Sequence, residues 1–401
     1  MTTTEFDADR PLPGAPEPWT WTSMPSVRTG PPFHMTEMIA AEPALAERVL
    51  ARLGEPGAGG DGSAARLASA LREAANAGAP IVVTGCGTSE HGALGAVEIL
   101  RAAMLRAGLP GPGPVAAQAF EAALDPQRGG LLIAVSHEGT TWATNRAIET
   151  ARAAGASVAI ITVSPRSPGA ALADIVLATG ELDQSWCHTV GYLSPLLAAT
   201  ATGAALNGGS DGAQAIRALL AAATADVGAV ESAAKSLAGA THLIVIASGA
   251  DRTAGRELTL KVEEAAWIPS AYRDLETFLH GHLPATGAST GLILVQADRA
   301  ARSERLERAR KALAAARELG VIAAAIVAAD VAAGLDGSLT PAGRVIVPEA
   351  PDLPGPIAAL MGTATALQLL TERIARARGT NPDAIRRDDP RYLAASAAIE
   401  G

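Results

Sequence analysis

The feature that most constrains this chain is a repeated order of segments. A short apolar run is followed by a polar or glycine-rich turn and then by a segment with helical periodicity. In the first half such runs lie at 80–84, 131–135, 157–163 and 175–178. Continuous apolar strands that alternate with helices predict a parallel sheet with helices on both faces and right-handed crossovers.

The second half of the chain repeats this order. Its apolar runs lie at 242–247, 291–295, 321–327 and 344–347. Leu131 and Leu292 are 161 positions apart, and Gly85 and Gly249 are 164 apart, so the offset is nearly constant. A chain of 401 residues also exceeds what one hydrophobic core normally holds. We therefore expect two duplicated, flavodoxin-like α/β lobes.

Four segments are expected along the chain. Residues 1–34 are rich in Pro, Thr and Asp, which is typical of an extended arm. A leading helix and the first lobe take 35–208, the second lobe takes 209–378, and a tail at 379–401 closes the site. Pro43 could begin a second helix within the leading segment.

Composition narrows the classes of function. The formal net charge is −9 at pH 7 and no basic run is interleaved with aromatic residues, so we expect neither nucleic acid nor a membrane surface as a partner. Only Cys86 and Cys187 are present, and no Cys/His spacing suits a metal. With no signal peptide or membrane-span pattern, these features predict a cytoplasmic protein without a metal or other cofactor.

Two turns at the ends of neighbouring apolar runs carry residues suited to ligand binding. The first, TGCGTSEHG at 84–92, combines a close backbone approach at Gly87 with the hydroxyls of Thr88 and Ser89 near a helix N-terminus. The second, SHEGTT at 136–141, contains Ser136, His137, Glu138 and Thr141. Such turns converge at one edge of a parallel sheet. The alternatives are a tight packing turn and ordinary helix caps, and a dinucleotide site is disfavoured because the spacing is not GxGxxG.

Further motifs give the chain a family resemblance. The chain resembles the sugar isomerase (SIS) family in a series of motifs. They are GCGTS, SxxGTT one strand later, AxxAD…GE over 171–181, and then Thr189. The second half resembles the isomerase domain of glucosamine-6-phosphate synthase and related amino-sugar isomerases, deaminases and deglycases. The residues that carry this resemblance are GRELTLKVEEAAWIPSAY and the His-Gly step at His280. The segment MTEMIAAEP at 35–43 is similar to the helix before the first lobe there. The resemblance implies two lobes that bind a sugar or sugar phosphate.

The resemblance also implies roles for single residues. Glu264 matches the base that moves a proton between C1 and C2, and His280 matches the ring-opening histidine, which the family contributes to the neighbouring subunit's site, so a homodimer is expected. Both residue types suit this proton chemistry. Glu263 competes as the base, but Glu264 shares a helix face with Glu257 and Lys261. The alternatives are an exposed face of ion pairs and surface-loop histidines.

This sequence departs from the family pattern at several points. The family loop reads SxSGxT, and Glu138 replaces its second serine, where a carboxylate would repel a phosphate. Glu138 either pairs with a cation such as Arg146 or protonated His137, or faces an uncharged hydroxyl or an amine of the ligand, which we favour. Ala395 replaces the family's Schiff-base lysine and His282 replaces the HGP proline, and we expect no glutamine-dependent amination.

Together these residues predict an enzyme that interconverts an aldose-type and a ketose-type sugar, with or without an amino substituent. The reaction is expected to pass through a cis-enediol, with Glu264 as the base and His280 opening the ring. The far end of the sugar is expected to contact Thr88, Ser89, Ser136, His137, Glu138 and Thr141, with Thr189 and Lys261 closing the pocket. An amino-sugar deaminase or deglycase and a non-catalytic sugar-sensing protein are the alternatives. The sequence leaves open which sugar binds, whether it is phosphorylated, and the direction of the reaction.

Overall fold

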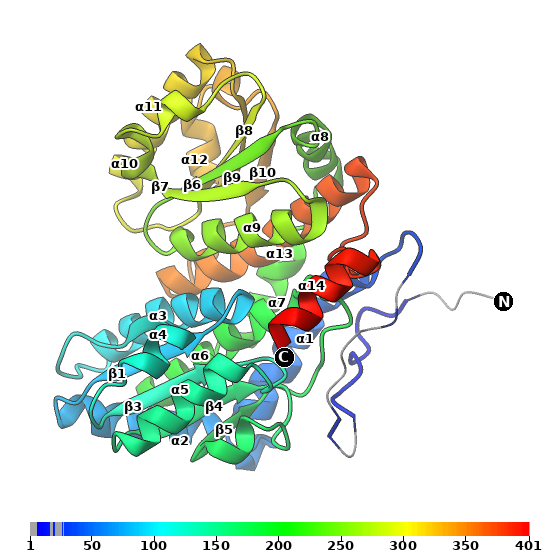
Figure 1. Ribbon diagram of the computed structural model, residues 1–401. Helices are drawn as coiled ribbons and strands as arrows, with labels where there is room; N and C mark the ends of the chain where they lie inside the picture. The colour runs from blue at the N-terminus through cyan, green and yellow to red at the C-terminus, as the bar shows by residue number, and fades with distance from the viewer. Residues whose placement is uncertain (1–5, 17–18, 21–25, 27, 401) are drawn as a thin grey trace.

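The computed structural model describes residues 6–16, 19–20, 26 and 28–400. They form two α/β lobes, one above the other in Figure 1, with the C-terminal helix lying beside the junction. Among the described residues, no single helix is long and apolar enough to cross a membrane, although the bent pair Ala213–Ala222 and Val227–Leu237 passes on length and composition.

The first lobe is built on a five-stranded parallel sheet with the order β2-β1-β3-β4-β5. Its strands are β1 (Ile81–Gly85), β2 (Val115–Gln118), β3 (Leu131–Val135), β4 (Ser157–Thr162) and β5 (Ile175–Ala178). Both central strands β1 and β3 are buried at every residue. This burial on both faces explains their continuous apolar runs.

The second lobe repeats this topology. Its parallel sheet has the order β10-β9-β8-β6-β7, which is the order of the first sheet read from the opposite edge. Its strands are β6 (His242–Ala247), β7 (Ser270–Asp274), β8 (Thr290–Gln296), β9 (Ile322–Ala328) and β10 (Arg344–Val347). The prediction of two duplicated, flavodoxin-like lobes is confirmed.

Two strands were not predicted, and both lie at a sheet edge. Strand β2 pairs with β1 and strand β7 pairs with β6. Every residue of β7 is half-buried, and β2 is half-buried or exposed along its length. Strand β2 (VAAQ) is only four residues long, and β7 (SAYRD) carries polar residues, so neither shows the longer apolar run by which a buried strand is recognised.

Helix α1 (His34–Leu53) is continuous, so the suggestion of a second helix beginning at Pro43 is wrong. Pro43 lies inside the helix, and Ile39 before it and Leu45 after it are both buried in the same core. Proline removes one backbone donor from the helix. Burial of the apolar face on both sides of Pro43 holds the two halves in one line.

Four long helices form the contact between the lobes. They are α3 (Thr88–Arg106), α6 (Val190–Asn207), α9 (Asp251–Ala266) and α13 (Gly355–Arg378). Helix α3 packs on α6 and α9, and α13 packs on α9. Figure 1 shows α3, α9 and α13 between the two sheets. One cluster of buried apolar side chains runs through both lobes along these helices.

The remaining helices cover the outer faces or connect the segments. They are α2 (Ser63–Asn76), α4 (Ala119–Leu124), α5 (Trp142–Ala153), α7 (Ala213–Ala222), α8 (Val227–Leu237), α10 (Leu275–Leu279), α11 (Arg302–Glu318), α12 (Ala329–Gly334) and α14 (Pro390–Glu400), with short 3₁₀ turns at 56–58, 170–172, 283–285 and 337–339. Helix α7, just past the expected lobe boundary, packs on α1 and α13. Of the expected arm, residues 1–5, 17–18, 21–25 and 27 lie outside the described residues.

Candidate functional site

The two predicted binding turns lie at the carboxyl ends of β1 and β3. Strand β1 ends at Gly85 and α3 begins at Thr88, while β3 ends at Val135 and α5 begins at Trp142. Because β1 and β3 are paired neighbours, both turns lie at one edge of the first sheet. Gly87 has φ 58° and ψ −128°, a backbone conformation that favours glycine.

The hydroxyl groups of these turns do not act as helix caps. Neither α3 nor α5 has a side-chain hydrogen bond at its N-terminal cap. The buried Thr88 hydroxyl donates to Glu257 Oε1 at 3.4 Å, and Ser136 Oγ donates to Thr141 Oγ1 at 3.5 Å. Ser89 lies half-buried in the first turn of α3. The first turn therefore places the Thr88 hydroxyl against the second lobe, and the hydroxyls of the second turn contact each other.

Helix α9 carries a buried charged group, so its carboxylates and lysine do not form an exposed face of ion pairs. The side chains of Glu257 and Lys261 have no exposed surface, and that of Glu264 is 21% exposed. Lys261 Nζ lies 3.7 Å from Glu257 Oε1 and donates a hydrogen bond to Glu264. His91 Nδ1 of α3 lies 2.7 Å from Glu257 Oε2. The group thus links both lobes.

The members of this group shift one another's pKa. Burial alone would lower the pKa of Lys261, but Glu264 and Glu257 outweigh it and raise the pKa. Burial raises the pKa of Glu264, and the attraction of Lys261 only partly opposes this. For Glu257, Lys261 and His91 outweigh burial, so its pKa is lowered. Glu264 is therefore the carboxylate of the pair that more readily accepts a proton.

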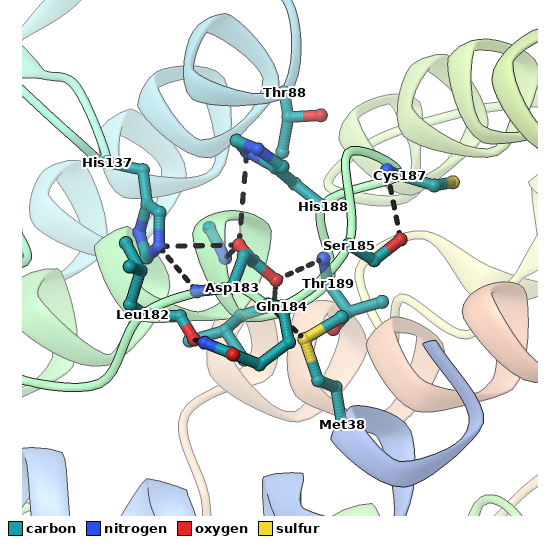
Figure 2. Close-up of polar contacts among 12 residues, drawn as sticks. Met38, Thr88, His137, Leu182, Asp183, Gln184, Ser185, Cys187, His188 and Thr189 are labelled. Atoms are coloured by element: carbon teal, nitrogen blue, oxygen red, sulfur yellow. Dashed lines mark hydrogen bonds and ion pairs between the residues drawn. The ribbon is translucent and has the colours of Figure 1, made fainter. Parts of the chain in front are cut away.

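A second polar group surrounds Asp183, which the sequence analysis missed. Asp183 Oδ1 accepts from the backbone N–H groups of Thr189 and Val190, both at 3.1 Å, and Oδ2 accepts from Gly191 at 2.7 Å. These groups form the N-terminus of α6, and Figure 2 shows the carboxylate against it. A helix N-terminus stabilises an anion. Here the protein's own carboxylate occupies that position.

Two histidines lie against Asp183 (Figure 2). His137 Nε2 accepts the Asp183 backbone N–H at 3.0 Å, while His188 Nδ1 lies 3.9 Å from Asp183 Oδ2. The ring centroids are 5.5 Å apart and edge-on. Burial lowers the pKa of His137, and burial lowers that of His188 from 6.5 to about 4. Both rings are neutral at pH 7, so the protonated His137 considered as a partner for Glu138 does not form.

The other predicted binding residues are placed as follows. Thr189 is the cap residue of α6 and fully buried, and its hydroxyl has no hydrogen-bond partner within the described parts of the chain. Glu138 is half-buried in the loop between β3 and α5. Arg146, the other cation considered for Glu138, lies 3.1 Å from Glu149 on the exposed side of α5.

His280 and Glu264 are not brought together within one chain. His280 follows α10, is 71% exposed, and its Nε2 lies 2.9 Å from Glu276 Oε1. Helix α10 contributes Phe278 to a core cluster distinct from the one that contains α9. The two clusters take alternate residues of β6, so α9 and α10 cover opposite faces of the second sheet.

Glu264 lines an open hollow of about 450 Å³ between the end of α9 and the C-terminal tail. The other lining residues are Glu263, Trp267, Ile268, Pro269, Ile385, Arg386 and Tyr392. An apolar cavity of about 150 Å³ near Pro80 and Leu131 lies at the opposite end of the first sheet and contains none of the predicted site residues. Across the described residues, no cluster of three or more His, Cys, Asp or Glu side chains is suited to a metal ion.

Comparison with known proteins identifies relatives for this geometry. Residues 75–206 match the model of the SIS domain family. No curated protein matches the chain. The C-terminal domain of glucosamine-fructose-6-phosphate aminotransferase from Francisella tularensis has a TM-score of 0.74 at 18% identity, over 89% of this chain and 100% of that chain.

Two further solved structures share the fold. Tagatose-6-phosphate ketose/aldose isomerase from Escherichia coli has a TM-score of 0.66 at 17% identity, over 91% of this chain and 98% of that chain. Glucosamine-6-phosphate deaminase from Thermotoga maritima has a TM-score of 0.59 at 18% identity, over 76% of this chain and 88% of that chain. The matched family segment contains β1 to β5 and both binding turns. The first lobe therefore matches the SIS domain family, and the two-lobed fold is shared with these solved structures.

Proposed function

We propose that this protein is a sugar isomerase that interconverts an aldose-type and a ketose-type sugar by acid/base enolisation, acting as a homodimer. The observation that carries the proposal is Glu264. Its carboxylate has a raised pKa, touches the buried Lys261, and lines a hollow large enough for a ligand. A carboxylate placed in this way is suited to taking a proton from carbon and giving it back.

In the proposed reaction Glu264 removes the proton from C2 of the open-chain aldose. The electron pair forms the C1–C2 double bond of a cis-enediol while the C1 carbonyl oxygen gains a proton. Glu264 then returns its proton to C1, and the C2 hydroxyl loses its proton as the ketose carbonyl forms, so that a proton passes overall from O2 to O1. Burial raises the pKa of Glu264 and Lys261 partly opposes this rise, which favours the ionised carboxylate that acts as the base. His280 of a neighbouring subunit opens the sugar ring.

The proposed substrate places a hydroxyl or an amine at the first-lobe turns. Asp183 occupies the N-terminus of α6, Glu257 underlies Thr88, and Glu138 stands where the family has a serine. The N-terminus of α6 is therefore not open to a phosphate, and the nearby His137 and His188 are neutral at pH 7 and add no positive charge. The solved relatives are named for phosphorylated sugars, whereas these residues favour an unphosphorylated end.

A deaminase or deglycase is the second candidate function. It uses the same base to convert the carbon that bears the amine into a C=N group, which water hydrolyses to release the amine. Glu263 and Glu264 line the hollow together, and a carboxylate holds a protonated amine by charge-assisted hydrogen bonds. Release of ammonia or of an amino acid separates this candidate from an isomerase, which releases neither.

The test is to compare Glu264→Gln with wild type on a panel of aldoses, amino sugars and their phosphates in D₂O. We expect Glu264→Gln to slow product formation and deuterium uptake at C2 or C1 by roughly 10²- to 10⁴-fold. The control is Glu149→Gln, which makes the same chemical change at an exposed carboxylate of α5. Undiminished turnover in Glu264→Gln contradicts the mechanism, and a loss in Glu263→Gln instead assigns the base to Glu263.

A further inference from the structure

Arg386 lies against two aromatic rings in the wall of the hollow that Glu264 lines. Its guanidinium carbon is 4.4 Å from the ring centroid of Trp267 and 4.0 Å from that of Tyr392. Both distances are within the range of a favourable cation–π contact. Two such contacts restrict the movement of the guanidinium and do not use its N–H donors.

The backbone around this arrangement is unusual. Trp267 has φ 57°, Ile385 has φ 42° and Arg386 has φ 63°, all in the left-handed region. Non-glycine residues rarely adopt this region, and such conformations concentrate where surrounding contacts hold a functional geometry. Trp267 follows α9, whereas Ile385 and Arg386 belong to the tail. Two segments far apart in the sequence thus together position the Arg386 guanidinium.

Within the described residues the guanidinium of Arg386 donates no hydrogen bond and contacts two aromatic rings instead. After Arg391, the charge of Arg386 also contributes to the lowered pKa of Asp389. Its neighbour Arg391 differs, because its side chain is 84% exposed and lies 2.8 Å from Asp389. A fixed guanidinium has a planar fork of N–H donors that matches a carboxylate in bidentate fashion.

We propose that Arg386 is the receptor for a carboxylate of the substrate, near the carbons on which Glu264 acts. The inference rests on the proposed function in one respect, namely that Glu264 marks the reacting carbons. The opposite end of the site supports it, since Asp183 already occupies the N-terminus of α6, where an anion of the ligand could otherwise bind. We therefore place the neutral or cationic end of the ligand at the first lobe.

The ligand class that follows is a sugar derivative with a carboxylate on the substituent at C1 or C2. A ketose joined through an amine at C1 to an amino acid has this shape. The hollow of about 450 Å³ is within the size range of small-molecule sites and holds a substituent beyond the sugar. Within this hollow the carboxylate reaches Arg386 while the carbons that carry the substituent lie at Glu264.

The test measures binding to a matched pair of ligands, 1-deoxy-1-glycino-fructose and 1-deoxy-1-methylamino-fructose, which differ by one carboxylate. Titration calorimetry on wild type is expected to give roughly tenfold or tighter binding of the glycine conjugate. Arg386→Ala should reduce this preference to near onefold, and Arg386→Lys should restore only part of it because the planar fork is absent. Arg391→Ala is the matched control and should keep the full preference.

Each outcome decides the proposal. An equal preference in Arg386→Ala and wild type, or binding of neither ligand by wild type, overturns it. Tighter binding that depends on Arg386 for glucose 6-phosphate, but not for the glycine conjugate, would assign Arg386 to phosphate binding. That result also overturns the proposal. Melting curves without ligand show whether the variants fold. Since binding is read without turnover, failure here and failure of Glu264→Gln are separate results.

Discussion

Lys261 illustrates how single residues hold the candidate site together. A lone buried ammonium would lose its proton or destabilise the fold, but Lys261 lies between two carboxylates of its own helix. In Glu264→Gln the cation keeps Glu257 at 3.7 Å as a counter-charge. The variant is therefore expected to fold, so a loss of turnover reports on chemistry and not on collapse of the site.

His188 predicts a pH-dependent stability. Its pKa is lowered by burial from 6.5 to about 4, so between these pH values the unfolded chain binds a proton that the folded chain does not. The free energy of unfolding must therefore fall as pH drops from 6.5 toward 4. Urea unfolding at pH 7 and pH 5 should show a smaller loss of unfolding free energy for His188→Asn than for wild type. Equal losses in both would contradict the prediction.

At the scale of elements, close approaches of α3 place the first binding turn. A methyl group at Gly92 would lie 2.4 Å from Cγ of Pro195 in α6, and one at Gly85 would lie 2.6 Å from the backbone of Ser89 in α3. The first contact sets the separation of the two helices. The second sets how closely the end of β1 meets the start of α3, and hence where Thr88 and Ser89 stand.

Gly85→Ala is expected to destabilise the protein because the methyl group meets backbone, which cannot rotate away. Overpacking of this kind costs about 1–3 kcal/mol. Gly355→Ala at the start of α13 is the control, since a methyl group there meets nothing within 4 Å. Chemical denaturation should show a lower midpoint for Gly85→Ala only. A midpoint at the wild-type value would mean that the strand–helix junction is looser than the structure indicates.

At the scale of the whole molecule, the second sheet separates the two predicted catalytic residues. Helix α9 and the segment that ends in His280 cover its opposite faces, while α9 faces the first lobe. Burial of apolar side chains on both faces makes large movement of either element costly. A second copy of the chain, related by a two-fold axis, is the simplest way to bring His280 to the Glu264 of its partner.

Mixing two inactive variants tests this arrangement. A dimer of Glu264→Gln with His280→Ala contains one site with both residues intact when the histidine crosses the interface. Random exchange makes half of the dimers mixed, so activity should return to about a quarter of wild type. Light scattering should give the mass of a dimer. A mixture as inactive as either variant alone would show that His280 is not donated across the interface.

The sequence by itself determined the central strands, the duplicated lobes and the position of the binding turns. Continuous apolar runs require burial on both faces, and parallel strands bring their carboxyl ends to one edge. The edge strand β7 could not be predicted from the sequence, because SAYRD is half-buried and has no apolar run. The resemblance to a family also pointed to Glu264, but nothing local distinguished a buried charged group on α9 from an exposed face of ion pairs.

Only the tertiary structure decided which polar residues are buried and what they contact. Glu257 meets His91, 166 positions away, and Asp183 meets His137, 46 positions away. Arg386 of the tail stacks on Trp267 at the end of α9. The burial and charge state of such residues depend on partners that the fold brings from distant segments, and local pattern carries no record of those partners.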